Sequence, residues 1–340
     1  MLSGEATGGI LADQVDGQRR SVGIVVGTIA SDGKQVIARG ARGEGGGSPL
    51  DGDTVFEIGS VAKVFTALLL VEMVQRGEVS LDDPLAKYLP AGVKVPERSG
   101  RKITLLDLAT HTSGLPTWAS NMPLPGDPAL ADYGFDQLIE FLSGYELTRE
   151  TGAEWEYSNV GYALLGYALA RRAGMDFESL VRERITGPLG MRSTATRATP
   201  EMRRRLSGGH DPDLRPAPYM KVPVLVAAGA GWLSTANDLL ALLGAVLGYV
   251  GSPLAPAMAA MLDVSRPGPM FLRARQALGW RVYGEGELGI VGIEGATIGF
   301  TSALAFSLKM REGAVVLYNA RSVVDGANSA AGLAAVVLAG

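Results

Sequence analysis

The chain has 340 residues, of which 47% are hydrophobic, and a formal net charge of -4, so it can bury a large core. A disordered or fibrous chain is excluded, and the absence of cysteine excludes disulfide scaffolds, thiolate nucleophiles and cysteine-based zinc sites. The weakly acidic balance gives no broad basic field, so we expect no nucleic-acid partner. The two histidines, His111 and His210, are few for a metal enzyme.

The N-terminal segment lacks a basic start followed by an apolar core, so no secretory signal is visible. The longest apolar runs, such as VPVLVAAGAGW, contain proline and glycine and are too short to span a membrane. We therefore expect a soluble protein, either cytoplasmic or exported with its leader already removed. The only basic run, Arg203 to Arg205, is expected to be a solvated helix end or loop. The oligomeric state is left open.

Strand signals come first along the chain. SVGIVVGTIA and QVIARGARG are β-branched runs around the tight turn SDGK, a pattern typical of a β-hairpin. An apolar helix is then predicted from Ser60 to about Arg76, ending at Gly77, and Leu81 to Leu89 begins a shorter one.

The middle of the chain is mainly helical. From Ile103 to about Met191, helical segments close near glycine, in LLDLATHTSG, FDQLIEFLSG, NVGYALLGYALARRAG and FESLVRERI. Further helices are expected within residues 232–262, in STANDLLALLGAVLG and PAMAAMLDV.

The last third predicts antiparallel strands in LGWRVYG, LGIVGIEG, TSALAFSLK and GAVVLYNA, followed by a small-residue helix from Asp325 to Leu338. Strands at both ends of the chain predict a single sheet. We therefore predict an α+β fold with an α/β lobe and a mainly helical lobe. The α/β lobe comprises residues 1–80 and 225–340, with an antiparallel sheet flanked by N- and C-terminal helices. The helical lobe comprises residues 81–224, and the active site lies in the cleft between the lobes.

The predicted apolar helix opens on Ser60 and Lys63, which are three residues apart and therefore share one face. A serine hydroxyl is a poor nucleophile at neutral pH, and a neighbouring lysine whose pKa is lowered by burial can act as its base. The free N–H groups and the dipole of a helix start can stabilise the oxyanion of an acyl transfer. The structural alternative is that Ser60 caps the helix and Lys63 is an ordinary solvated lysine.

Two later segments carry further polar chemistry. EYSNVGYALLG places Tyr157 and Asn159 on one short loop before an apolar helix. A tyrosine beside a lysine can be held partly as phenolate and take the serine proton, and the Asn159 amide can bind a substrate carbonyl. The structural alternative is a helix cap with a packed tyrosine. GIEGATIGFTSALAFSLK is a glycine-rich edge that lets a substrate approach backbone N–H groups, although glycines also mark bulges.

Together and in this order, these segments resemble the serine β-lactamase and penicillin-binding protein superfamily, whose S-x-x-K signature Ser60 and Lys63 match. The likeness runs from about Gly23 to Asn319. FEIGSVAKVFTALLLVEMVQRGEVSLDDPLAKYLP looks like the active-site helix of the family, ITLLDLATHTSGLP like its next landmark, and WEYSNVGYALLG like its second motif. The Y-S-N form is similar to the Y-x-N of class C β-lactamases, family VIII carboxylesterases and some D-amino peptidases.

The resemblance implies a β-lactamase/transpeptidase-like fold and an acyl-serine mechanism that needs no metal or organic cofactor. It implies Ser60 as the acylated nucleophile, Lys63 as proton acceptor or pKa tuner, and Tyr157 as general base and acid. Asn159 would contact a substrate amide. The backbone N–H groups of Ser60 and Ala296 would hold the oxyanion.

The third motif departs from the family. Counting back from Gly299 and Phe300, Ile293, Glu294 and Gly295 stand where these families carry K-T-G or H-x-G. Glycine is kept, but the cation that normally meets a substrate carboxylate is replaced by Ile293. The loss favours neutral esters over β-lactams and peptidoglycan peptides.

We therefore predict a carboxylesterase that acts on small, short-chain esters, with weak β-lactam hydrolysis as a side activity. A β-lactamase, a D-amino-acid peptidase or amidase, and a catalytically inactive binding module stay as alternatives. An ordinary Ser-His-Asp hydrolase is not favoured, because no G-x-S-x-G segment is present. His111 is expected to brace a loop and His210 to be a loop residue. Core or pocket-rim positions are expected for Trp118, Trp155, Trp232 and Tyr133.

Overall fold

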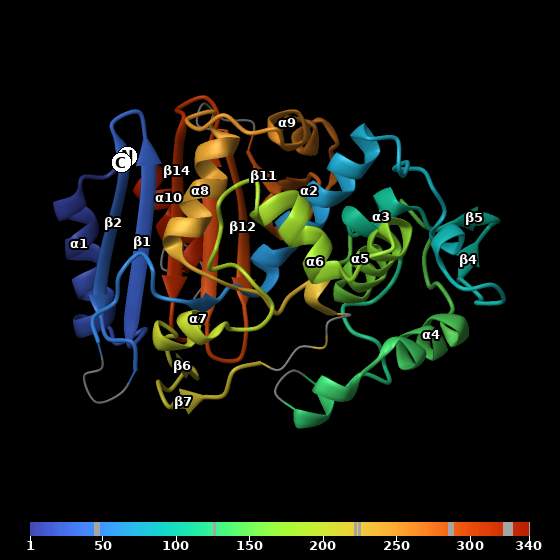
Figure 1. The fold of residues 1–340 in the computed structure, drawn as a ribbon, viewed down its shortest axis with the longest axis horizontal. Coiled ribbons are helices and arrows are strands. Elements are labelled where there is room, and N and C mark those ends of the chain that lie inside the picture. The colour runs from blue at the N-terminus through green and yellow to red at the C-terminus, as the bar shows by residue number, and fades with distance from the viewer. Residues whose placement is uncertain are drawn as a thin grey trace.

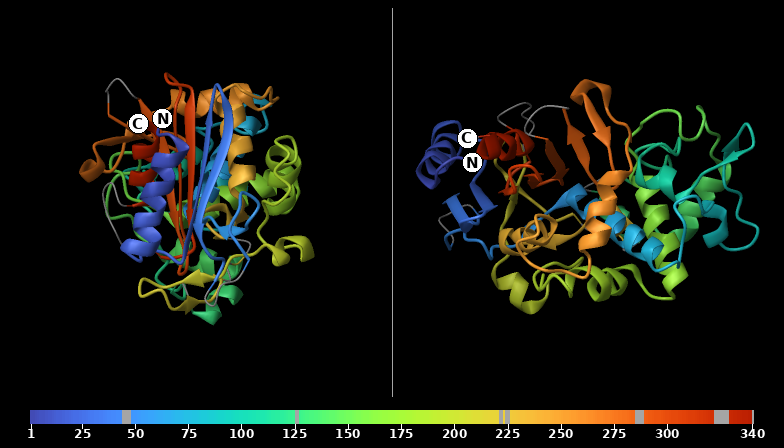
Figure 2. Two further views of the ribbon diagram at one scale, coloured as in Figure 1. Left: turned by 90° about the vertical axis from the view of Figure 1, so that its left-hand side faces the viewer. Right: turned by 90° about the horizontal axis from the view of Figure 1, so that it is seen from above.

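The structure is a computed structural model that describes residues 1–43, 48–124, 127–220, 223, 226–284, 289–321 and 329–339. A central antiparallel sheet carries helices on both faces, and a further group of helices lies beside it (Figure 1, Figure 2). The predicted α+β architecture is confirmed.

Within the described residues, the main sheet has eight strands in the spatial order β2-β1-β14-β13-β12-β11-β10-β9. Its first and last strands in chain order pair directly, from Ile24↔Tyr318 to Ile29↔Gly313, so both ends of the chain contribute to one sheet as predicted. The strands are β1 Gly23–Ala30, β2 Gly33–Gly40, β9 Arg266–Pro267, β10 Ala274–Gln276, β11 Arg281–Tyr283, β12 Ile290–Ala296, β13 Thr301–Ser307 and β14 Glu312–Tyr318.

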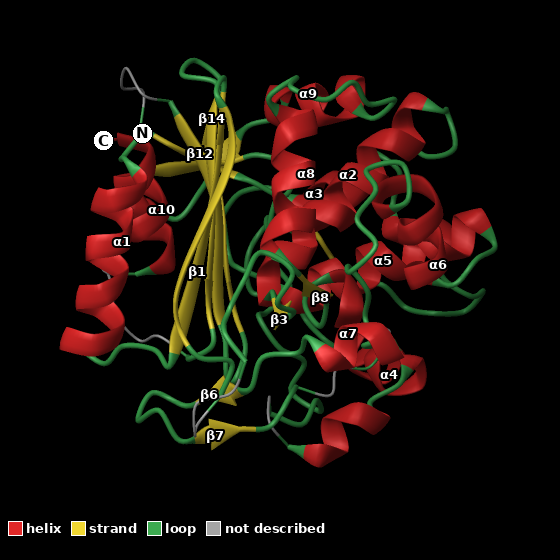
Figure 3. Ribbon diagram, turned by 60° about the vertical axis from the view of Figure 1, so that its left-hand side comes forward, coloured by secondary structure: helices red, strands yellow, loops and turns green. Residues whose placement is uncertain are grey.

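Side chains alternate across this sheet, as the two-residue period of a strand requires. Ile24, Val26 and Val316 face a smaller apolar cluster shared with α1 and α10, whereas Val25 and Leu317 face the larger core. Figure 3 shows α1 and α10 on one side of the strands and α8 and α2 on the other. Both faces of the central strands are therefore covered.

Helix α5 begins and ends at the capping residues that its sequence predicts. Ser158 caps α5 by accepting from Gly161 N, and Gly174 ends it in a left-handed conformation. No helix in the described part of the chain is long and apolar enough to cross a bilayer. The helices are α1 Gly4–Ala12, α2 Ala62–Gln75, α3 Leu105–Ala109, α4 Phe135–Gly144, α5 Asn159–Ala173, α6 Phe177–Val181, α7 Pro200–Arg204, α8 Ala236–Val246, α9 Ala255–Asp263 and α10 Ala330–Ala339.

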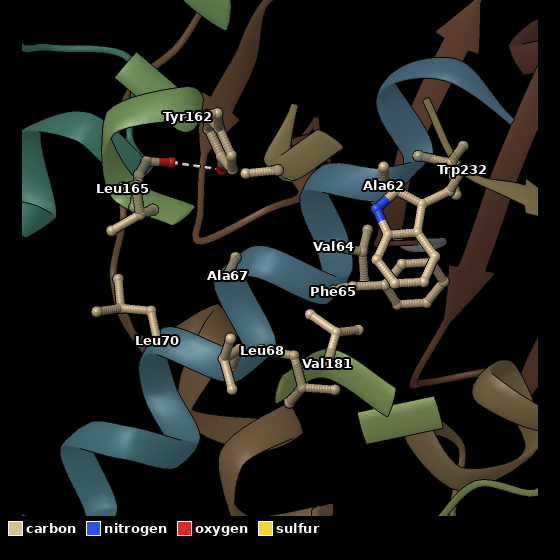
Figure 4. Close-up of a cluster of buried hydrophobic side chains, with 14 of the residues drawn as sticks. Ala62, Val64, Phe65, Ala67, Leu68, Leu70, Tyr162, Leu165, Val181 and Trp232 are labelled. Carbon is tan, nitrogen blue, oxygen red and sulfur yellow. Dashed lines mark hydrogen bonds between the residues drawn. The ribbon is translucent and has the colours of Figure 1, made fainter. Parts of the chain in front are cut away.

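Helix α2 is enclosed on all sides. Every residue from Ala62 to Met73 is buried, and Figure 4 shows side chains of α5, Val181 of α6 and Trp232 packed around it. Full burial of one leucine or valine contributes roughly 1.5–3 kcal/mol of hydrophobic stabilisation. The helix therefore cannot shift without a large loss of stability, and the residues at its start are held firmly.

The middle region is less purely helical than predicted. Two short strand pairs interrupt it, β4 Glu97–Arg98 with β5 Arg101–Lys102, and β6 Gly209–His210 with β7 Pro216–Ala217. A third short pair, β3 Phe56–Glu57 with β8 Leu233–Ser234, lies beside α2. Strands of two residues are too short to show a period in the sequence. The lobe boundaries at residues 80 and 224–225 stay a prediction, and the second, like residues 325–328 of the predicted last helix, lies outside the described residues.

Candidate active site

Ser60 lies in a 3-10 turn, Gly59–Val61, that leads directly into α2. Gly59 has a φ of +48°, a left-handed conformation in which a side chain would be strained. The hydroxyl of Ser302 on β13 donates to Ile58 O at 2.8 Å and fastens the turn to the sheet. The predicted helix start is therefore present, in a tighter form than an α-helix.

This turn and β12 cross in direct backbone contact, and two glycines make the contact possible. A Cβ added at Gly59 would lie 2.6 Å from Ala296 N. A Cβ added at Gly295 would lie 2.2 Å from Ile58 O and 2.9 Å from Ser60 N. These separations are shorter than van der Waals contact, so only glycine fits. The amide nitrogens of Ser60 and Ala296 consequently lie at the same crossing.

Lys63 lies in the first turn of α2, on the same face as Ser60. It is buried, with 1% of its surface exposed. Its Nζ lies 2.6 Å from Gly229 O, 2.7 Å from Asn159 Oδ1 and 3.2 Å from Ser60 Oγ. Burial lowers the pKa of Lys63 below its ordinary value of 10.5. A neutral amine has two N–H groups, which match the two shorter contacts, and its lone pair then faces the serine hydroxyl. Lys63 can therefore accept the serine proton.

Tyr157 reaches the same hydroxyl from the helical side of the pocket. Its Oη lies 2.5 Å from Ser60 Oγ, and Lys63 Nζ lies 4.7 Å from the centroid of its ring. Thr117 holds the loop: its hydroxyl donates to Tyr157 O at 2.7 Å, and its carbonyl accepts from Asn159 N at 3.1 Å. The structure thus brings together the four polar side chains that the sequence singled out in two separate segments.

His111 holds the residues directly before and after Tyr157. Its carbonyl accepts from Glu156 N at 2.8 Å, and its Nδ1 accepts from Ser158 N at 3.1 Å. The rings of His111 and Tyr157 lie with centroids 4.7 Å apart. Burial lowers the pKa of His111 well below its ordinary value of 6.5, and the charge of Arg281 lowers it further. The neutral ring keeps the lone pair that this hydrogen bond requires, which agrees with the predicted bracing role.

Strand β12 forms the opposite wall of the pocket. Ile293 and Glu294 line it, followed by Gly295 and Ala296 at the crossing. Ile293 is only 9% exposed and belongs to the large core, so it presents an apolar surface beside the serine.

The sequence did not assign several lining residues of this pocket. The most consequential is Arg281 on β11, which pairs with Gly292 of β12. That register is a long-range property, so no local pattern marks Arg281. The other unassigned lining residues are Tyr162, Gln276, Gly279 and Trp280.

The four aromatic residues suggested from the sequence lie outside the pocket lining found in the described residues. Trp232 and Tyr133 are buried in the core, and Trp118 packs against it. Trp155 is half-buried and donates to Gln276 Oε1 at 3.1 Å, which links it to the pocket edge. These positions agree with the expected core or rim placement.

The expectation for His210 is wrong. It lies in strand β6, is 1% exposed, and its Nδ1 is 2.7 Å from Asn319 O. His210 therefore ties β6 to the end of the central sheet, and the polar neighbours that made SGGHDPD look like a loop follow it. Arg203 and Arg204 are exposed at the end of α7, as predicted for the basic run, whereas Arg205 is half-buried and donates to Asp53 O at 2.6 Å and to Ser193 Oγ at 3.0 Å.

A protein-family model described as Beta-lactamase matches residues 10–339. The chain belongs to the beta-lactamase family. The structure of the beta-lactamase/D-alanine carboxypeptidase from Yersinia pestis is similar over 99% of both chains, with a TM-score of 0.82 and 27% identity. A class C beta-lactamase is similar over 94% of this chain and 92% of its own, with a TM-score of 0.81 and 21% identity. The class C beta-lactamase-like fold is therefore confirmed.

Relatives within the beta-lactamase family carry different named activities. Esterase EstB of Burkholderia gladioli is 30% identical over 268 residues, which are 69% of this chain and 68% of EstB. The D-alanyl-D-alanine-carboxypeptidase/endopeptidase AmpH of Escherichia coli is 39% identical over 158 residues, 45% of this chain. The chain matches 40% of the length of AmpH. The family is one of serine hydrolases related to beta-lactamases and penicillin-binding proteins, and its members differ in substrate.

Proposed function

We propose that the protein hydrolyses short-chain carboxylic esters through a covalent acyl-enzyme at Ser60. The observation that carries the proposal is the position of Ser60 Oγ between two proton acceptors, Tyr157 Oη at 2.5 Å and Lys63 Nζ at 3.2 Å. A serine that only caps a helix needs neither contact. The 30% identity to esterase EstB supports an ester as the substrate.

In the first step, Ser60 Oγ attacks the ester carbonyl carbon while its proton passes to Tyr157 Oη as the phenol proton moves on to the Lys63 amine, or passes directly to that amine. The carbonyl oxygen becomes an oxyanion, to which the N–H groups of Ser60 and Ala296 at the backbone crossing donate. The bond between the carbonyl carbon and the alcohol oxygen then breaks. The alcohol leaves with the proton that Tyr157 returns, and the acyl group stays on Ser60.

Water releases the acid in the second step. It attacks the acyl carbon and gives a proton to the same base, which returns it to Ser60 Oγ as the acid leaves. Asn159 Oδ1 accepts from Lys63, so the NH₂ group of Asn159 is the part that can donate to a substrate carbonyl. We place this chemistry in the cleft between the two proposed lobes, because residues of both line the pocket.

D-peptide or β-lactam hydrolysis is the second candidate, favoured by the similarity to AmpH and to the Yersinia pestis protein. The same acyl transfer serves these amide substrates. Ile293 weighs against it, since an apolar residue replaces the cation expected at that position.

One experiment tests the proposal and separates the candidates. Hydrolysis of p-nitrophenyl acetate and butyrate is compared with that of nitrocefin for the wild type and Ser60→Ala, with intact mass spectrometry for the acyl adduct. We expect ester turnover that exceeds nitrocefin turnover and falls roughly 10⁴-fold or more in Ser60→Ala, with no adduct. Rapid nitrocefin turnover would favour the second candidate, and ester turnover that persists in a folded Ser60→Ala variant would refute the mechanism.

A further inference from the structure

His111 holds a backbone conformation that residues with side chains rarely adopt. Its φ is +60°, in the left-handed region. The residue follows helix α3, where His111 N donates to Leu108 O at 3.4 Å and Thr112 N donates to Asp107 O at 2.9 Å. In this helix-ending arrangement glycine normally takes the left-handed position, because it does so without strain. The strain indicates that the side chain of His111 has a function that glycine could not perform.

The position of His111 separates it from the other residues with the same backbone conformation. Among the described residues, the other non-glycine residues with a positive φ are exposed or half-buried, namely Arg19, Ser99, Leu214, Arg273 and Arg311. His111 is only 3% exposed and lines the pocket together with Ser60 and Tyr157. Strained residues cluster at active sites, where the surrounding structure holds them in place.

The His111 ring is fixed against the reacting tyrosine. Its Nδ1 accepts from Ser158 N at 3.1 Å, and Ser158 directly follows Tyr157. The ring centroids of His111 and Tyr157 are 4.7 Å apart, and Tyr162 packs on the same histidine with centroids 5.1 Å apart. A displacement of the His111 ring would therefore reach Tyr157 Oη, which lies 2.5 Å from Ser60 Oγ.

The hydrogen bond to Ser158 exists only while the ring is neutral, because Nδ1 then keeps a lone pair and the ring proton is on Nε2. The titratable and charged groups that face the ring are Lys63, Tyr157, Tyr162 and Arg281. Burial opposes protonation most strongly, the charge of Arg281 adds to it, and the pKa of His111 is well below 6.5. In acid, a proton on Nδ1 would meet the N–H of Ser158 and break this contact.

We propose that His111 is a positioning residue for the general base: its neutral ring holds Tyr157 Oη against Ser60, and protonation of the ring releases the tyrosine. This inference rests on the proposed ester hydrolysis at Ser60. It goes beyond the bracing of a loop, because it gives His111 an effect on reaction rates and an acid limit to activity. Since Tyr157 serves both acylation and release of the acid, both rates fall together when it is displaced, and KM changes little.

Two substitutions separate the hydrogen bond from the backbone strain. Asparagine tolerates the left-handed conformation and its Oδ1 can accept from Ser158 N, whereas glycine relieves the strain and offers no acceptor. With p-nitrophenyl acetate, we expect kcat to fall roughly 10²-fold in His111→Gly and about 10-fold or less in His111→Asn, with KM within about threefold in both. An unchanged kcat in His111→Gly, or equal losses in the two variants, would overturn the proposal.

Arg19→Gly is the matched control for the glycine substitution. Arg19 also has a left-handed φ, +50°, but it is exposed and does not line the pocket. The substitution relieves strain away from Tyr157, so its kcat should equal that of the wild type. Urea unfolding shows that each variant is folded. A loss of kcat in Arg19→Gly as large as that in His111→Gly would overturn the proposal, because the loss would then not depend on the His111 ring.

The pH dependence of kcat/KM is a readout that a purely structural role would not move. Lys63 accepts a proton only while it is neutral, so its protonation lowers kcat/KM with a dependence on one proton. Protonation of His111 adds a second proton below pH 6.5. We expect the wild-type profile to steepen from a one-proton to a two-proton dependence there, and the profile of His111→Asn to keep the one-proton dependence. Identical profiles would overturn the proposal.

Labelling with a fluorophosphonate keeps this test separate from the proposed hydrolysis. Ser60 Oγ bonds to phosphorus, fluoride leaves, and the serine proton passes to the base, so intact mass spectrometry follows the nucleophile without an ester. We expect Ser60 to be labelled in the wild type and labelled more slowly in His111→Gly. No labelling of the folded wild type would refute the reactive Ser60, whereas equal labelling rates in the two proteins would refute the role of His111 alone.

Discussion

The two walls of the pocket are held in different ways. On the side of α2 and α5, the reacting groups bond one another: Lys63 contacts Ser60 and Asn159, and Ser60 contacts Tyr157. On the side of β12 and β11, Ile293 is apolar and Arg281 has no bonded partner among the described residues. The first wall fails if one member changes, because each group positions another. On the second wall Ile293 and Arg281 do not position each other, so one of them can change without displacing the other.

The largest expected effect within this comparison comes from Tyr157→Phe. The ring and its tilted contact with His111 are kept, but the oxygen 2.5 Å from Ser60 Oγ is lost. We expect acylation by p-nitrophenyl acetate to slow roughly 10²- to 10⁴-fold. Rapid-quench mass spectrometry of the acyl adduct measures this step. Near-normal acylation would show that Tyr157 is not the base. It would also show that the reacting groups on the side of α2 and α5 depend on one another less than we infer.

Gly295→Ala tests the crossing where the two walls meet. The added Cβ would lie 2.2 Å from Ile58 O, so β12 and the Ser60 turn must separate. Because this separation disturbs the N–H groups of Ser60 and Ala296 together, we expect kcat for the ester to fall roughly 10²- to 10³-fold. The control is Gly251→Ala, where an added Cβ meets nothing within 4 Å. Equal kcat values for the two variants would contradict the assigned oxyanion site.

Glu57→Gln tests a buried carboxylate on β3, three residues before Ser60. Glu57 Oε1 accepts from Met220 N at 2.7 Å, whereas Oε2 has no hydrogen-bond partner among the described residues. Burial raises the pKa of Glu57 from 4.5 to about 7. Between pH 4.5 and about 7, the folded state binds more protons than the unfolded state, so the free energy of unfolding falls as pH rises. This destabilisation reaches its full size above pH 7.

The glutamine variant removes the destabilisation caused by the ionised carboxylate. We expect Glu57→Gln to raise the free energy of unfolding at pH 8 by at most on the order of 3 kcal/mol, and much less at pH 5. Urea unfolding at the two pH values measures the difference. The same change at both pH values would mean that Glu57 does not titrate in this range.

The smallest expected effect comes from Ile293→Lys, on the pocket wall formed by β11 and β12. A lysine there restores a cation next to Arg281 without touching the bonded groups of the other wall. We expect the ratio of nitrocefin to p-nitrophenyl acetate turnover to rise by about 10-fold or less, since lysine offers a point charge on a flexible stem. An unchanged ratio would show that position 293 does not select the substrate.

Much of the fold followed from local patterns. The β-branched run of β1, the glycine-spaced runs of β12–β14 and the uninterrupted apolar stretch of α2 predicted their elements, and the three-residue spacing placed Ser60 beside Lys63. The meeting of Tyr157 with Ser60 came from resemblance, because it depends on contacts 97 positions apart. Arg281 and His210 were missed for the same physical reason: strand register and long-range pairing decide where their side chains point.

The direct pairing of β1 with β14 has a consequence for how the chain folds. β1 is made before β14, and its neighbour β2 follows it directly in the chain, but its other edge has no partner until β14 has been synthesised. Pairing of such distant segments is slow, and an unpaired strand edge invites association with other chains. We therefore expect refolding to be limited by closure of this sheet, and chain-terminating truncations before Glu312 to aggregate rather than to accumulate as monomers.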